Sequence, residues 1–240
     1  MGSLTVERPT PPIVKSTLVL TFLVFASCAQ LPAPSSSSDG DFDIYFIDVE
    51  GGQSTLMVSP SGESILVDTG WLGNDGRDAD RIAATARRAG VDTLDYLVIT
   101  HYHDDHVGGM DALAERLNFR TVITHGETTE TGRMADTGRP IYANAMRISG
   151  AREVLVQPGD VIPIEGLDIK VLASRRNLIP NALPGAGMPT AGCDTVQQRR
   201  RDTSDNSASV GMLITFGEFK FLDIGDLTQD LEYEMACPVN

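Results

Sequence analysis

The sequence predicts an α/β protein folded as a four-layer αββα sandwich, in which two sheets pack face to face between layers of helices. One β-rich block lies in the first third of the chain and another towards its end, with helical periodicity between them. A continuous apolar run at 94–100 is typical of a buried strand. The second half of the sandwich is expected to be incomplete, because its pattern of strands and helices stops at Asn240.

Hydrophobic periodicity predicts the elements of this fold in order. Residues 41–49 alternate as a half-buried strand does, and a Pro-Ser-Gly-Glu turn at 60–63 joins two further strands. In the helix expected at 78–89, Ile82 and Ala86 share one face, and Gly90 ends it. The other expected elements are strands at 54–59, 64–67, 120–124, 153–156 and 167–172, helices at 108–117, 142–149 and from 228, and a hairpin of 210–216 with 219–224.

The first 41 residues indicate an exported protein. Arg8 and Lys15 precede a short apolar run at 18–26, which small residues follow, as in a secretory signal. We therefore expect a signal at 1–29, a flexible linker at 30–41 and one domain at 42–240. Two outcomes compete, namely cleavage before Gln30 and lipidation of Cys28. The protein would be periplasmic or extracellular, and would meet a membrane only through the signal or a lipid anchor at Cys28.

The charge balance argues against a nucleic-acid-binding surface. The chain has 33 acidic and 19 basic residues, a formal net charge of −14, and such a surface repels polyanions. The only basic run, at 199–201, is followed directly by Asp202, so it is a solvated loop or, as the alternative, a phosphate-binding loop. Cys193 and Cys237 would remain after export, where they either pair in a disulfide or stay as free thiols.

A cluster of histidines carries the chemistry. Three of the four histidines in the chain, His101, His103 and His106, fall within six residues, together with Asp105. Imidazole is a good zinc ligand, and a carboxylate completes catalytic sites that keep a position open for water. The segment follows the buried strand at 94–100, so the sequence predicts a metal site at the end of that strand.

This segment matches the His-x-His-x-Asp-His signature of the metallo-β-lactamase superfamily, and the chain resembles that superfamily in two further motifs. The resemblance implies two zinc ions, one on His101 and His103 and the other on Asp105 and His106, with Asp226 of Ile-Gly-Asp bridging them. It also implies hydrolysis by zinc-bound hydroxide, with Asp105 as the catalytic residue that receives the proton as the leaving group departs. Ester, amide and phosphodiester substrates all suit such a site.

The second motif is Leu-Val-Asp-Thr-Gly, whose Asp68 is expected to orient the histidines by hydrogen bonds or to cap the strand before it. A closer similarity concerns residues 48–54 and 205–210, which resemble the hydrolase domain of competence DNA-uptake channels. The expected relatives are therefore exported, competence-protein-like metallo-hydrolases of bacteria. Their substrates would be small molecules or phosphodiesters.

Two departures from the family pattern raise questions about the site. Typical members place a third histidine shortly before the last hairpin, where this chain has Asp205, Asn206 and Ser207. Asn206 or the more distant His125 would fill the gap, either as ligand or as a residue that holds a ligand. The family's last histidine ligand follows the helix that begins near Thr228. We therefore expect the chain to be truncated, and weak or inactive beside a longer active parent.

Two rival interpretations remain. One is a non-catalytic exported binding protein with a degenerate metal site, which the missing histidines favour. The other is a di-iron enzyme that uses oxygen on the same fold. The long segment at 173–207, which has no clear periodicity, is expected to border the metal site and control substrate access.

Overall fold

The computed structural model describes residues 40–128, 130–184, 186–197 and 200–237. The predicted signal and nearly all of the predicted linker lie outside the described residues. Within the described part of the chain, no helix is both long enough and apolar enough to cross a membrane.

The first sheet carries the predicted metal motif. It contains β1 (Asp43–Phe46), β2 (Thr55–Val58), β3 (Ser64–Val67), β4 (Thr93–Val98), β5 (Asn118–Thr124) and β6 (Arg152–Leu155), in that spatial order. β1 to β3 pair antiparallel, whereas β3 to β6 run parallel. Parallel neighbours need crossover connections, and each of the three crossovers contains a helix. These helices are α1 (Arg77–Arg88), α2 (Met110–Ala114) and α3 (Arg133–Ser149). The short 3-10 helix η1 (Asn74–Gly76) precedes α1.

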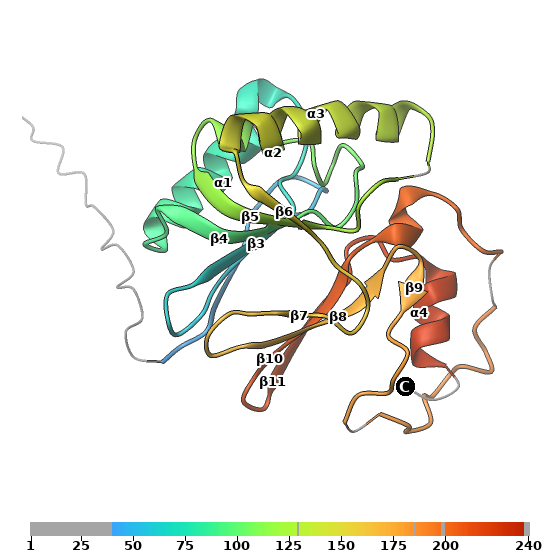
Figure 1. Cartoon of the computed structure of the whole chain (residues 1–240). Coiled ribbons are helices and arrows are strands. Elements are labelled where there is room, and N and C mark those ends of the chain that lie inside the picture. The colour runs from blue at the N-terminus through green and yellow to red at the C-terminus, as the bar shows by residue number, and fades with distance from the viewer. Residues whose placement is uncertain (1–39, 129, 185, 198–199, 238–240) are drawn as a thin grey trace, which may run out of the picture. The chain divides into compact units, whose positions relative to one another are not determined.

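The three helices cover one face of this sheet, and a second sheet covers the other (Figure 1). The second sheet contains β7 (Val161–Ile162), β8 (Asp168–Ser174), β9 (Asn177–Leu178), β10 (Gly211–Phe216) and β11 (Phe219–Asp223). Its order is β11-β10-β8-β7, with β9 paired to β8, and its pairings are antiparallel. The predicted packing of two sheets, with helices on the first, is confirmed.

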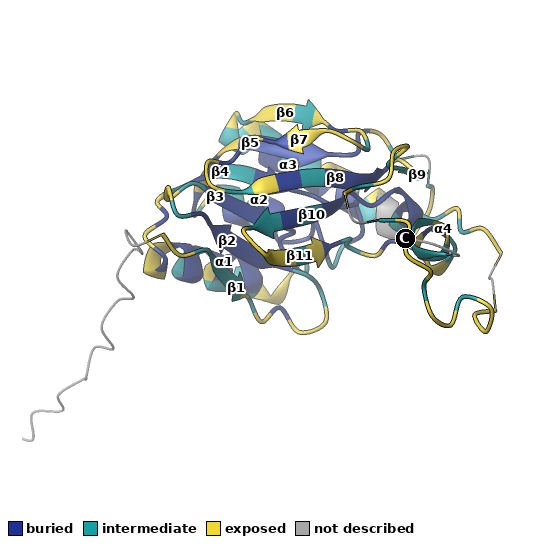
Figure 2. Cartoon of the chain, turned by 90° about the horizontal axis from the view of Figure 1, so that it is seen from below, coloured by how far each residue is buried: buried dark blue, intermediate teal, exposed yellow. Residues whose placement is uncertain are grey.

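Alternation along the central strands creates two cores. Leu97 packs beneath the helices, and its neighbour Val98 packs against the second sheet; Leu56 and Met57 divide in the same way. Figure 2 shows that buried residues concentrate along the inner strands, whereas the edge strands β6 and β11 are largely exposed. With both faces covered, the first sheet provides a rigid base for residues at the ends of its strands.

The fourth layer is represented in the described residues by one helix, α4 (Gln229–Ala236). Leu227 and Leu231 pack against Ala173, near the end of β8 and away from the middle of the second sheet. Leu222 of β11 is 50 % exposed and Val161 of β7 is 53 % exposed. Within the described residues, α4 therefore covers only one end of the second sheet.

Several element boundaries differ from those that periodicity predicts, and α3 differs most. The helix expected at 142–149 begins at Arg133 instead, and runs through Gly138 and Pro140, two residues that weaken helices. A Cβ at Gly138 would overlap the carbonyl oxygen of Tyr102, so close packing on the metal loop explains the glycine. The expected helix at 108–117 is shorter, as α2, and the segment at 173–207 contains β9 and the start of the 3-10 helix η2 (Asp205–Ala208).

A disulfide joins the two cysteines that the sequence left open as a pair or as free thiols. Cys193 and Cys237 are bonded; their Cα atoms are 5.7 Å apart, and the two residues are 44 positions apart in sequence. The bond links the irregular segment before η2 to the residue that follows α4.

Candidate metal centre

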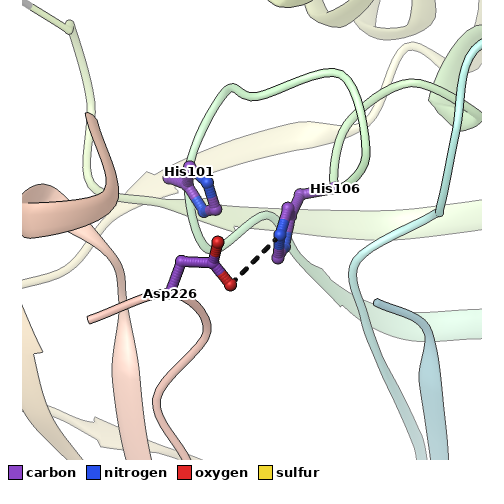
Figure 3. Close-up of side chains that lie close together, drawn as sticks. All are labelled: His101, His106 and Asp226. Carbon is purple, nitrogen blue, oxygen red and sulfur yellow. Dashed lines mark ion pairs between the residues drawn. The ribbon is translucent and has the colours of Figure 1, made fainter. Parts of the chain in front are cut away.

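The predicted ligands meet at the carboxyl edge of the first sheet. His101 to His106 form the loop after β4, and Asp226 follows β11 of the second sheet (Figure 3). The carboxyl ends of parallel strands are the usual place for sites in open α/β sheets. The two sheets therefore each contribute part of one cluster.

Three of the predicted ligands form the tightest group. His101, His106 and Asp226 each offer a ligand atom within 4.8 Å of the other two. The distance from His106 Nε2 to an Asp226 carboxylate oxygen is 3.4 Å, and that to an Asp105 oxygen is 3.7 Å. The ring centres of His101 and His103 lie 4.6 Å apart. The structure thus gathers all five predicted ligands, with His103 and Asp105 at the margin of the group.

Asp68 determines which nitrogen of His106 faces the group. Its buried carboxylate accepts hydrogen bonds from the Thr100 backbone N–H, at 2.8 Å, and from the Thr100 hydroxyl, at 2.6 Å. It also lies 2.7 Å from His106 Nδ1. A carboxylate accepts from an N–H, so Nδ1 carries a proton, and the lone pair of the neutral His106 ring is on Nε2. The expected orienting contact of Asp68 is therefore present.

The same logic fixes the tautomer of His101. The Thr100 hydroxyl has one proton, which it donates to Asp68, so it can only accept from His101 Nδ1, 3.1 Å away. The lone pair of His101 is then on Nε2. That atom is buried and has no hydrogen-bond partner among the described residues. A buried nitrogen without a partner costs folding free energy. A metal ion would accept its lone pair, so this donor set fits zinc.

The family model of the metallo-β-lactamase superfamily matches residues 47–188, which include the histidine loop and Asp68. The chain belongs to the metallo-β-lactamase superfamily.

Individual relatives match over limited parts of the chain. A metal-dependent hydrolase of Staphylococcus saprophyticus is 38 % identical over 76 residues, or 32 % of this chain and 29 % of the relative. The match thus spans less than a third of that relative's length. A metallo-β-lactamase from Cronobacter sakazakii aligns with a TM-score of 0.46 and 14 % identity, over 78 % of this chain and 60 % of that chain. A metallo-β-lactamase fold protein from Bacillus subtilis has a TM-score of 0.44 and 15 % identity, over 75 % and 60 %.

The two histidines closest to Asp226 have opposite electrostatic environments. Burial lowers the pKa of His106, but the carboxylates of Asp68 and Asp226 outweigh this effect and raise that pKa to about 10. For His101, burial and the neighbouring His106 hold the pKa well below its ordinary value. The hydrogen bond with His106 lowers the pKa of Asp226. In the metal-free protein, a proton on His106 supplies the positive charge that a bound metal cation would otherwise supply.

Glycines allow neighbouring segments to press on the metal loop. A Cβ at Gly52 would overlap the carbonyl oxygen of Asp105, and one at Gly108 would overlap that of Asp104. The backbone N–H of Gln53 donates to the same Asp105 oxygen at 3.2 Å. The segment at 48–54 therefore supports the loop from one side.

The residues proposed for the missing third histidine are His125 and Asn206. His125 is buried, and its Nε2 is 3.3 Å from the carboxylate of Asp205, which also accepts the Tyr102 N–H at 2.8 Å. Burial raises the pKa of Asp205, but the hydrogen bond and charge of His125 outweigh it, and the net pKa is lowered. His125 thus contacts Asp205, which in turn bonds the backbone of the metal loop at Tyr102. Asn206 has a buried side-chain oxygen with no partner among the described residues, and its role stays a prediction.

Sequence reasoning missed several polar residues that hold the ligands. Thr100 and Ser209 both approach His101 Nδ1, the latter at 3.4 Å. Thr100 adjoins the motif, so its position was a usable signal. Ser209 is 108 residues away from His101 in sequence, and no local pattern indicates such a contact.

Proposed function

We propose that the chain is an exported metal-dependent hydrolase with its centre on His101, His106 and Asp226, flanked by His103 and Asp105. The observation that carries the proposal is the buried His101 Nε2, which has no described partner, in a residue that offers a ligand atom within 4.8 Å of ligand atoms of His106 and Asp226. Membership of the superfamily supports the same conclusion.

Each residue has a distinct task in this centre. His101 and His103 would hold one ion, Asp105 and His106 the other, and Asp226 would bridge them. Bound zinc would supply Lewis acidity and lower the pKa of coordinated water to about 7. Asp68 keeps the Nε2 lone pair of His106 available. The carboxylate of Asp105, whose side chain is 19 % exposed, would accept a proton from the attacking water or deliver one to the leaving group.

The proposed substrates are small esters, amides or phosphodiesters. The net charge of −14 supports a small substrate over a long nucleic acid. The disulfide between Cys193 and Cys237 supports an oxidising compartment, as does the signal-like N-terminus. Kinship with competence-channel hydrolases rests on the segments at 48–54 and 205–210 alone.

Metal content and turnover, measured together, test this proposal. The purified chain would be loaded with zinc, iron or manganese, and assayed on a phosphodiester, a lactone and an amide. Metal binding with hydrolysis that is lost in Asp226→Ala supports the proposal, and Asp95→Asn, at the opposite end of β4, is the matched control. Metal binding without turnover would favour the binding-protein interpretation, and oxygen consumption with bound iron would favour the di-iron enzyme. A chain that binds no metal would contradict both enzyme interpretations and would leave the binding protein with a degenerate site.

A further inference from the structure

Glu130 lies outside every motif of the sequence, yet its carboxylate contacts the metal loop. One of its oxygens is 3.0 Å from His103 Nε2 and also accepts the backbone N–H of Asp205 at 2.5 Å. The Glu130 side chain is 21 % exposed, and that of His103 is 8 % exposed. The contact is therefore largely shielded from water. A charge-assisted hydrogen bond is strong in such an environment.

This contact assigns the two nitrogens of His103. The Nε2 atom, beside a carboxylate, donates its proton, so the lone pair of the neutral ring is on Nδ1. His106 is held through Nδ1 by Asp68, and His101 through Nδ1 by Thr100. All three histidines of the motif thus have one nitrogen held by an oxygen outside the cluster and one nitrogen left as a donor. This arrangement is typical of histidines that bind metals.

We propose that Glu130 is a positioning residue that fixes the tautomer and ring orientation of His103, so that His103 offers Nδ1 to the metal. This inference rests on the proposed metal centre and extends it by one residue. The bond to the Asp205 N–H matters as well, because the carboxylate of Asp205 holds the Tyr102 N–H. Glu130 and Asp205 together restrain His103 through its ring and through the backbone that precedes it.

Loss of this carboxylate should weaken metal binding more than it weakens the fold. Without Glu130, the His103 ring can rotate and its proton can move to Nδ1, which removes one donor. Removing such an outer carboxylate typically lowers metal affinity by about 10- to 100-fold. In Glu130→Gln, the amide oxygen can accept both hydrogen bonds but carries no charge, so we expect a smaller but measurable loss of zinc affinity, about two- to tenfold.

The test compares Glu130→Ala and Glu130→Gln with the wild-type chain and with Glu127→Ala, whose exposed side chain lies on the same segment. Zinc affinity would be measured by competition with a chromophoric chelator, and the His103 tautomer in the zinc-free protein by long-range proton–nitrogen NMR. We expect Glu130→Ala to bind zinc at least about tenfold more weakly and to lose the Nε2–H tautomer. Glu127→Ala should match the wild type in both.

Two results would overturn the inference. One is zinc affinity in Glu130→Ala within twofold of the wild type; the other is an unchanged His103 tautomer, even with weaker binding, because that pattern marks a merely structural role. If Glu130→Ala fails to fold, Glu130→Gln decides, and zinc affinity equal to that of the wild type overturns the proposal. If the wild-type protein binds no zinc, the metal centre itself is refuted. If the wild type and Glu130→Ala bind zinc with equal affinity, only this inference is refuted.

Discussion

Asp68→Asn should disable the centre while leaving the shape of the site intact. Asp68 has a φ of 58°, in the left-handed region that asparagine tolerates well, so the backbone need not move. The asparagine oxygen can still accept the Thr100 N–H, but its amide group then faces His106 Nδ1. Because an amide N–H donates, His106 Nδ1 must become the acceptor. The imidazole proton moves to Nε2, the atom that faces Asp226 and Asp105.

The size of the effect follows from the contacts that are lost. Metal affinity should fall by at least about 10- to 100-fold, or roughly 1.4 to 2.7 kcal/mol. Two hydrogen bonds to a buried carboxylate, from the Thr100 hydroxyl and from His106, are weakened as well. Bonds to charged groups contribute about 1.5 to 3 kcal/mol each. The free energy of unfolding of the metal-free protein should therefore fall by roughly 3 kcal/mol.

Zinc affinity by chelator competition and urea unfolding of the metal-free protein measure both effects. Asp95→Asn is the control, because Asp95 also accepts a backbone N–H, from Ser64, but lies near the start of β4. It should leave zinc affinity unchanged. If Asp68→Asn binds zinc as tightly as the wild type, Asp68 does not set the tautomer of His106, and the argument for the donor atoms is wrong.

Three further predictions concern the surroundings of the site. Gly52→Ala should displace the metal loop, because the new Cβ overlaps the Asp105 carbonyl oxygen; zinc content after dialysis should fall, and unchanged content would show that the loop adapts. Cys193→Ser opens a loop of 44 residues, so urea unfolding should report a loss of up to about 4 kcal/mol; equal stability in oxidised wild type and variant would contradict it. Asp205→Asn should be less stable than the wild type at pH 7. Since folding lowers the pKa of Asp205 beside His125, its stabilisation is present above the unfolded pKa of about 3.9. The difference between the two proteins should therefore shrink as the pH falls below that value, and a constant difference from pH 7 to pH 3 would exclude the ionic contribution.

Local patterns predicted the elements whose signals are local. The strand expected at 64–67 agrees with β3 to the residue, because a glycine turn and Asp68 bound a short apolar run. The first half of α3 was missed, because Gly138 and Pro140 argue against a helix in isolation. Its packing on Tyr102, a tertiary contact, outweighs that weak propensity.

The same division holds for the site. His101, His106 and Asp226 are marked by motifs with fixed spacing, and the structure brings them together. Glu130 and Asp205 are 75 residues apart, and their contact exists only once two loops have folded beside each other. Sequence patterns therefore indicate the donors of a metal centre, whereas the residues that orient those donors emerge only from the structure.

The transition-metal content of the folded chain shows whether these residues hold a metal ion. The wild type would be incubated with excess zinc, dialysed and analysed by inductively coupled plasma mass spectrometry beside His101→Ala. We expect about one or two ions per wild-type chain and a clear loss in the variant, which lacks the buried donor Nε2. A wild-type chain without bound metal, or a variant with the same content, would contradict the claim that these residues form a metal centre.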